Sequence, residues 1–161
     1  MKYGEINMKL AEALLERKNL QTQLASIGQR LQANVLVQEG DEPSENPQTL
    51  LQDALRLNTQ LHRLIKAIHL TNAQAMSTHN RPLMDALNER DALLQQHRIL
   101  QQTIDAASEK QNRYSNHEIR WVKTVSVGDL QQQADAVGMR IRTNNLEIQA
   151  SNWHIDVIGL D

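Results

Sequence analysis

The sequence predicts an all-α fold of four long helices, packed as an up-down, coiled-coil-like bundle. Three observations predict this fold class. Apolar residues recur at alternating steps of three and four in four segments, which is the spacing of one helix face. Only 6 Gly and 3 Pro interrupt 161 residues, so breaks between helices are few. Phe is absent and aromatic residues make up only 2%, which suits narrow seams filled by Leu, Ile, Val and Ala.

The first helix is expected at about residues 7–32. Asn7 is placed to cap it, and residues 1–7 precede it as an N-terminal extension. The residues of its seam are Leu10, Ala13, Arg17, Leu20, Leu24, Ile27 and Leu31. This spacing is a heptad pattern, typical of a helix that packs along one side.

The second helix is expected at about residues 46–75, with Asn46 as the cap and Pro47 in the first turn. It carries two adjacent stripes, so we expect neighbours on two of its sides. The first stripe is Leu50, Ala54, Leu57, Leu61, Leu64 and Ile68. The second is Leu51, Leu55, Asn58, His62, Ile65, His69 and Asn72.

The third and fourth helices are expected at about residues 82–112 and 126–153. The third has the seam Leu83, Leu87, Arg90, Leu94, His97, Gln101 and Ile104. The fourth has the seam Val127, Leu130, Ala134, Val137, Ile141, Asn144 and Ile148, and Ser126 with Asp129 can form a capping box at its start. With no dividing linker or repeat, residues 1–161 are expected to form a single helical domain.

Two segments between helices are rich in β-branched and aromatic residues, residues 34–38 and 119–125. In an up-down bundle both connections lie at the same end, so the two segments are expected to pair there as a short β-ribbon. We call this end the loop pole. The first connection also carries an acidic loop with Glu39, Asp41, Glu42 and Glu45.

Composition and charge exclude several classes of protein. The net charge is −2 with no basic stripe, so we expect no nucleic-acid partner. Cys is absent, which excludes disulfides and thiolate metal sites. The chain has no apolar run long enough to span a membrane and no signal-peptide pattern, so we expect a cytoplasmic protein. The long seams exceed what one slender bundle can cover, so we expect a homo-oligomer, either a dimer or an assembly of dimers.

The chain resembles a known bacterial family in several short segments. Specific matches are residues 37–43, which read VQEGDEP, and residues 113–119, which combine RYS with EI. Further matches are residues 8–14, 71–73, 85–87, 89–91 and 152–153, so the resemblance covers roughly residues 8–153. This pattern resembles the DIP1984-like family, some of whose members are labelled septicolysin. The resemblance implies a helical, oligomeric protein of unassigned biochemical function, and the septicolysin label implies membrane lysis. It supplies no catalytic residues.

The strongest candidate site is the loop pole, where acceptors, donors and one imidazole would gather. The candidate ligand-binding residues are Glu39, Asp41, Glu42, Arg113, Tyr114, Ser115, His117 and Glu118. The alternative is that Arg113 and Arg120 neutralise the acidic loop through surface ion pairs. The loop does not match an EF-hand, and a metal or cofactor cannot be identified from it.

Other polar residues have structural interpretations beside chemical ones. His62 and His69 are two turns apart on one helix, about 10 Å, which is too far for one metal ion. His117-Glu118 would need a second His at position 121, where Trp121 stands. Arg90, near Glu89 and Asp91, is expected to form a buried ion pair with another helix, and Arg17 and His97 suggest the same role.

No catalytic motif is found, so the sequence favours a self-associating helical scaffold or binding protein. The first alternative is a ligand-binding or metal-binding protein, or an enzyme, that uses the loop pole. The second is a membrane-active protein of the septicolysin type.

Overall fold

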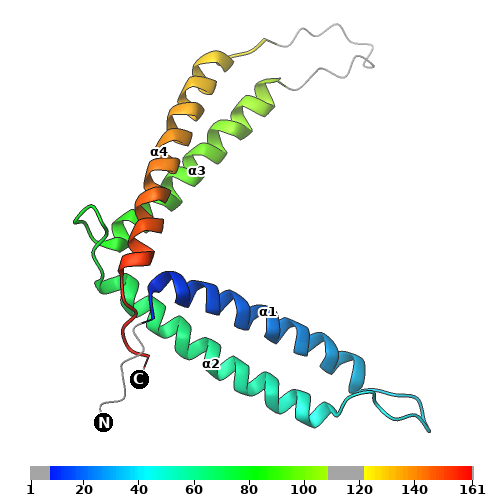
Figure 1. The fold of residues 1–161 in the computed structure, drawn as a ribbon. Helices are drawn as coiled ribbons and strands as arrows, with labels where there is room; N and C mark the ends of the chain where they lie inside the picture. The colour runs from blue at the N-terminus through cyan, green and yellow to red at the C-terminus, as the bar shows by residue number, and fades with distance from the viewer. Residues whose placement is uncertain (1–7, 109–121, 161) are drawn as a thin grey trace, which may run out of the picture. The chain divides into compact units, whose positions relative to one another are not determined.

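The protein is all-α, with four long helices and no sheet among the residues that the structure describes. The computed structural model describes residues 8–108 and 122–160. The helices are α1 (Leu10–Asn34), α2 (Pro47–Gln74), α3 (Leu83–Ser108) and α4 (Val127–His154) (Figure 1). Helix accounts for 76% of the described residues. The predicted all-α class with four long helices is confirmed, and their packing as one up-down bundle stays a prediction.

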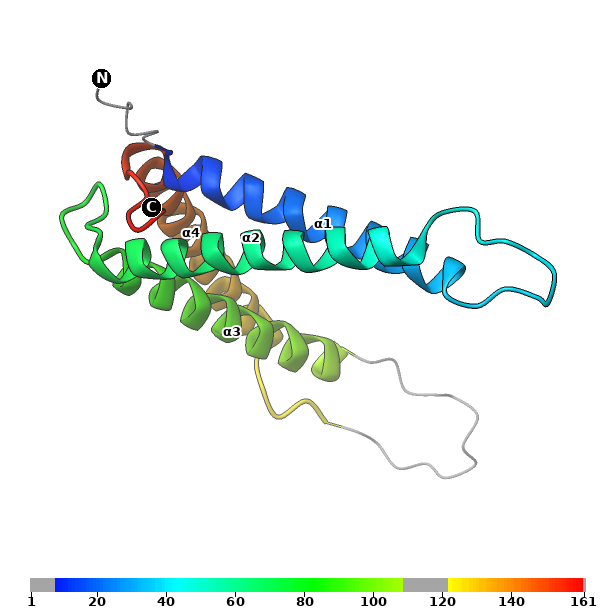
Figure 2. The ribbon, with the colours of Figure 1, turned by 90° about the horizontal axis from the view of Figure 1, so that it is seen from below.

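The chain divides into two compact units. One contains the chain up to Met76 together with Gln149–Asp161, and the other is Ser77–Ile148. In the first unit α1 and α2 lie side by side and antiparallel (Figures 1 and 2). Each helix turns one apolar stripe inward, as its seam predicts. The buried members of the two seams are Leu10, Ala13, Leu20, Leu50, Leu57, Leu61, Leu64 and Ile68.

The segment after α4 binds to the residues at the start of α1 in the first unit. The Leu10 amide donates to the Ile155 carbonyl at 2.9 Å, and the Val157 amide donates to Met8 at the same distance. Lys9 adds an ion pair to Asp156, at 2.7 Å. These contacts hold the segment after α4 against the start of α1 and the two residues before it.

Thr71 anchors the same segment to α2. Its side chain is buried, its hydroxyl donates to the Ala67 carbonyl at 2.8 Å, and it accepts from the Ile158 amide at 3.1 Å. The Thr71 hydroxyl therefore gives the Ile158 amide a hydrogen-bond acceptor on α2.

We expect Thr71→Val to lower the free energy of unfolding by about 1 kcal/mol, because the shape is kept and the Ile158 amide loses its acceptor. Thr59→Val is the matched control, since the Thr59 hydroxyl makes the same bond to Leu55 on the exposed face of α2. Urea unfolding followed by circular dichroism measures both variants. Equal stabilities of the two variants would contradict this role of Thr71.

In the second unit α3 packs antiparallel against α4 (Figures 1 and 2). The α4 seam is confirmed, with Ala134, Val137 and Ile148 buried. The α3 seam is wrong at one position: Leu93 is buried, while the predicted Leu94 is 44% exposed. Periodicity treats two adjacent Leu residues alike, so it does not decide which of them is buried.

The helix starts follow the predicted capping residues in two cases. The Asn46 side chain accepts from the amides of Gln48 and Thr49, with Pro47 in the first turn. The Ser126 hydroxyl accepts from the Asp129 amide at 3.3 Å. The first helix begins later than predicted, at Leu10, with Lys9 in the cap position, while the predicted cap Asn7 lies outside the described residues.

The predicted β-ribbon is not found in the residues that the structure describes. Residues 35–38 and 122–125 have no regular secondary structure, while 119–121 lie outside the described ranges. Helix α1 extends to Asn34. A few residues later the chain turns, and the Asp41 amide donates a hydrogen bond to the Gln38 carbonyl across this turn. Gly40 adopts a φ of 95° in this turn, a conformation that suits glycine. The short apolar run between them therefore stays an exposed connection.

Candidate functional site

The residues predicted for the loop pole are only partly described. Glu39, Asp41 and Glu42 are exposed in the connection between α1 and α2, and none makes an ion pair with another described residue. The other predicted residues lie outside the described ranges: Arg113, Tyr114, Ser115, His117 and Glu118. A ligand site that combines the two sets stays a prediction.

The fourth acidic residue of the loop, Glu45, has a local partner. Arg30 of α1 donates two hydrogen bonds to its carboxylate, one of them at 2.8 Å. The bonds lower the pKa of Glu45 and raise that of Arg30. The Glu45 amide also donates to the buried Asn34 side chain. Glu45 thus closes the α1–α2 connection and is not available to a cation site.

The other polar residues singled out from the sequence do not form a site. His62 and His69 are exposed on α2. Arg90 pairs with its neighbour Asp91 at 2.9 Å and not with another helix, so the predicted buried ion pair at Arg90 is wrong. Within residues 8–108 and 122–160, no cluster of His, Asp or Glu is arranged to hold a metal ion.

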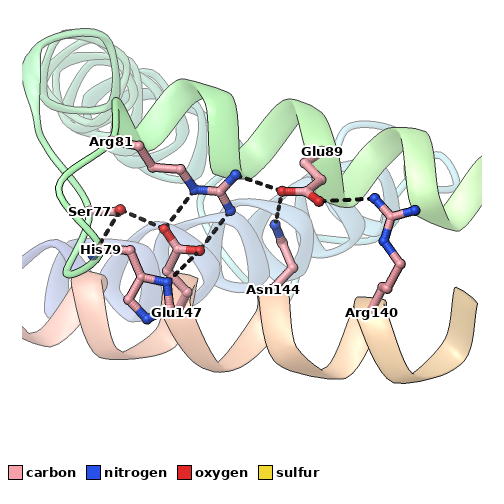
Figure 3. Close-up of polar contacts among 7 residues, drawn as sticks. All are labelled: Ser77, His79, Arg81, Glu89, Arg140, Asn144 and Glu147. Atoms are coloured by element: carbon pink, nitrogen blue, oxygen red, sulfur yellow. Dashed lines mark hydrogen bonds and ion pairs between the residues drawn. The ribbon is translucent and has the colours of Figure 1, made fainter. Parts of the chain in front are cut away.

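An ion pair with a buried carboxylate does link two elements of the second unit, and it joins the half-buried Arg81 to Glu147. Arg81 precedes α3, and Glu147 lies on the buried face of α4 with 3% of its side chain exposed. The guanidinium contacts both carboxylate oxygens, with Nε at 2.9 Å and Nη2 at 2.6 Å (Figure 3). This two-point geometry is the strongest form of an Arg–carboxylate contact.

Two residues of the α2–α3 connection also face Glu147. The Ser77 hydroxyl donates to Oε1 at 2.5 Å, and Nδ1 of His79 lies 3.2 Å from Oε2. The His79 amide donates to the Ser77 hydroxyl, which fixes the turn between them (Figure 3). The carboxylate of Glu147 is therefore surrounded by donors from one short connection.

The contacts continue from Arg81 along α3 and α4. Its Nη1 donates to Glu89 at 2.6 Å. Glu89 also accepts from Asn144 at 3.2 Å and from Arg140 at 3.3 Å (Figure 3). Two guanidinium groups thus balance two carboxylates. We call these seven residues the Arg81 cluster: Ser77, His79, Arg81, Glu89, Arg140, Asn144 and Glu147.

The electrostatics of the Arg81 cluster favour its charged form. Hydrogen bonds from Arg81, then from Ser77, lower the pKa of Glu147 to about 2, although burial opposes the shift. The same guanidinium lowers the pKa of Glu89, and the two carboxylates raise the pKa of Arg81. Glu147 is therefore ionised at every physiological pH.

This arrangement is suited to holding the connection in place and poorly suited to catalysis. A carboxylate with a pKa of about 2 is a weak base, and its oxygens are already hydrogen-bonded. The Ser77 hydroxyl and the His79 ring each contact Glu147, and the hydroxyl bonds to the His79 amide and not to the ring, so they do not form the relay that activates a serine nucleophile (Figure 3). The Arg81 cluster joins the α2–α3 connection and α3 to α4.

Sequence reasoning identified only the edge of this cluster. Asn144 belongs to the predicted seam of the fourth helix, and Glu89 stands next to Arg90 in the third. Arg81 lies just before the predicted third helix, and Glu147 lies one position away from Ile148 of the predicted seam. The signal that could have revealed it is the pair Asn144 and Glu147, three residues apart and therefore on one face of α4.

Comparisons with known proteins agree with the fold. The chain is similar to a crystal structure described as that of a functionally unknown conserved protein from Corynebacterium diphtheriae. The two are 34% identical, with a TM-score of 0.86 over 93% of this chain and 98% of the other. No curated protein matches the chain. Residues 17–157 match DUF6847, described as a family of unknown function. The predicted relationship to an uncharacterised bacterial family is confirmed, and the chain belongs to the DUF6847 family.

Proposed function

We propose that the protein is a self-associating helical scaffold, active as a homodimer or an assembly of dimers. The observation that carries this proposal is the set of large apolar side chains that the helices leave in solvent at helical spacing. Leu51 and Leu55 of α2 are 46% and 59% exposed, and Met139 and Leu146 of α4 are 65% and 69% exposed. Apolar surface of this kind usually marks a protein contact.

The pairing of helices supports this proposal. In each unit two long helices bury one stripe each against the other, and two helices alone make a thin core. Most of the second stripe of α2 is exposed in the part of the chain that the structure describes, although its spacing predicts a neighbour there. A second copy would supply the missing layer and complete the coiled-coil-like bundle that the sequence predicts.

The chemistry of the polar residues agrees with a role in binding rather than catalysis. The Arg81 cluster sets two guanidinium groups against two carboxylates, and it is centred on a weak base whose oxygens are already hydrogen-bonded. No described helix is long and apolar enough to cross a membrane. The exposed apolar stripes are then the most distinctive surface of the described chain.

We expect the purified protein to have a mass of at least twice the 18.3 kDa of one chain at micromolar concentration. The physical reason is that burying each exposed Leu or Met contributes about 1.5 to 3 kcal/mol, and symmetry doubles every contact. Size-exclusion chromatography with light scattering measures this mass. A mass of one chain at all concentrations tested would overturn the proposal.

A further inference from the structure

We infer that the outer face of α4 is the surface through which two copies of this chain pair, with the two α4 helices antiparallel. This inference rests on the proposed self-association and names the surface that carries it. Met139 and Leu146 lie seven residues apart on this face, with Thr143 between them and Ala136 one step before Met139. Steps of three and four over these positions form a second heptad seam, opposite the buried seam of α4.

The shape of this face is that of a coiled-coil surface. Met139, Arg142, Thr143 and Leu146 line a shallow depression of about 360 Å³. These are positions i, i+3, i+4 and i+7, the four residues that form a hole for a knob from a facing helix. Large and small side chains alternate along the seam, so Met139 of one helix can pack over Ala136 of another.

The charges beside the seam select a second copy in antiparallel orientation. Asp135 and Arg142 lie on the same edge of the seam, and neither makes an ion pair with a described residue. Seven residues separate them by about 10 Å along one helix, so they cannot pair within it. A two-fold axis that reverses the helix brings Asp135 of each copy beside Arg142 of the other. The same register places Met139 of each copy over Ala136 of the other.

A parallel arrangement of the same face fits less well. It would pair Asp135 with Arg140, and Arg142 with Glu147, across the two copies. Arg140 already contacts Glu89, and Glu147 is buried against Arg81. The outer face of α2 is also a weaker candidate, because after Leu51 and Leu55 its stripe continues with Asn58, His62 and His69.

Charge reversal tests this pairing. We expect Asp135→Arg or Arg142→Asp alone to weaken self-association by about tenfold or more, because each variant turns two attractive contacts into repulsive ones. The double variant Asp135→Arg/Arg142→Asp restores both pairs and should return the dissociation constant to within about threefold of the wild type. Sedimentation equilibrium measures the constants, and circular dichroism confirms that each variant is folded.

Leu146→Glu should weaken association at least as strongly as a single reversal. Leu15→Glu is its matched control, because Leu15 is also a Leu with 62% exposure, but it lies on α1. A wild-type chain that stays monomeric would overturn both the self-association and this pairing. An oligomer whose dissociation constant is unchanged by Asp135→Arg, Arg142→Asp and Leu146→Glu would overturn the α4 pairing alone.

Because the chain has no Cys, single introduced cysteines report the orientation. In the antiparallel pair, Ala136→Cys mixed with Met139→Cys should form disulfide-linked dimers under mild oxidation. Leu146→Cys alone should not, because its two copies stand about 25 Å apart along the helix axes. Efficient cross-linking of Leu146→Cys alone would indicate a parallel pair and overturn the inferred orientation.

Discussion

Arg81→Met is expected to lower the free energy of unfolding by about 3 kcal/mol. The substitution removes the cation from Glu147, whose side chain is 3% exposed, and an uncompensated buried carboxylate is one of the most costly defects in a folded protein. Glu89 is affected less, because Arg140 and Asn144 still donate to it. The Ser77 hydroxyl still donates to Glu147 but cannot replace a guanidinium that contacts both of its oxygens. Urea denaturation followed by circular dichroism measures the loss.

Two further variants separate the ion pair from the packing of Arg81. Arg140→Met removes the exposed guanidinium on Glu89 and should cost at most about 1 kcal/mol, as exposed pairs do. The double variant Arg81→Met/Glu147→Leu should recover at least half of the loss, because neither charge is then left buried alone. If Arg81→Met were no less stable than Arg140→Met, the Arg81 cluster would not hold the α2–α3 connection as proposed.

The helices could be predicted from the sequence because their signals are local. The α1 seam places Leu10, Ala13 and Leu20 in the core, and all three are buried. Asn46 before Pro47 identifies the start of α2 through capping geometry that depends on adjacent residues alone. An apolar pattern that repeats over many residues still predicts a helix when one residue departs from the pattern.

The contacts of the connections could not be predicted in the same way. Arg81 reaches Glu147 across 66 positions, and no spacing rule relates residues in different elements. The choice of Leu93 over Leu94 is likewise one that periodicity does not determine. Val35, Leu36 and Val37 have the composition of a strand, but a strand needs a partner, and their composition says nothing about one.

The Arg81 cluster should also make the stability of the protein depend on pH in the acid range. Glu147 has a pKa of about 2 in the folded protein, below its ordinary value of 4.5, and the pKa of Glu89 is lowered as well. A carboxyl whose folded pKa is depressed binds protons more readily when unfolded. Its contribution to stability is therefore complete above about pH 4.5 and is lost as the pH falls toward 2.

Glu147→Gln isolates this contribution, because the amide fills the same space and does not titrate. We expect the wild type to exceed this variant in stability by about 2 to 3 kcal/mol near neutral pH, and the difference to shrink steadily below about pH 4.5. Glu42→Gln is the control, since Glu42 is exposed in the acidic loop and makes no ion pair with a described residue. Its stability should follow that of the wild type at every pH. Urea unfolding at a series of pH values measures all three proteins, and a gap between the wild type and Glu147→Gln that stays constant from neutral pH to about pH 2.5 would contradict the low pKa of Glu147 and its assigned role.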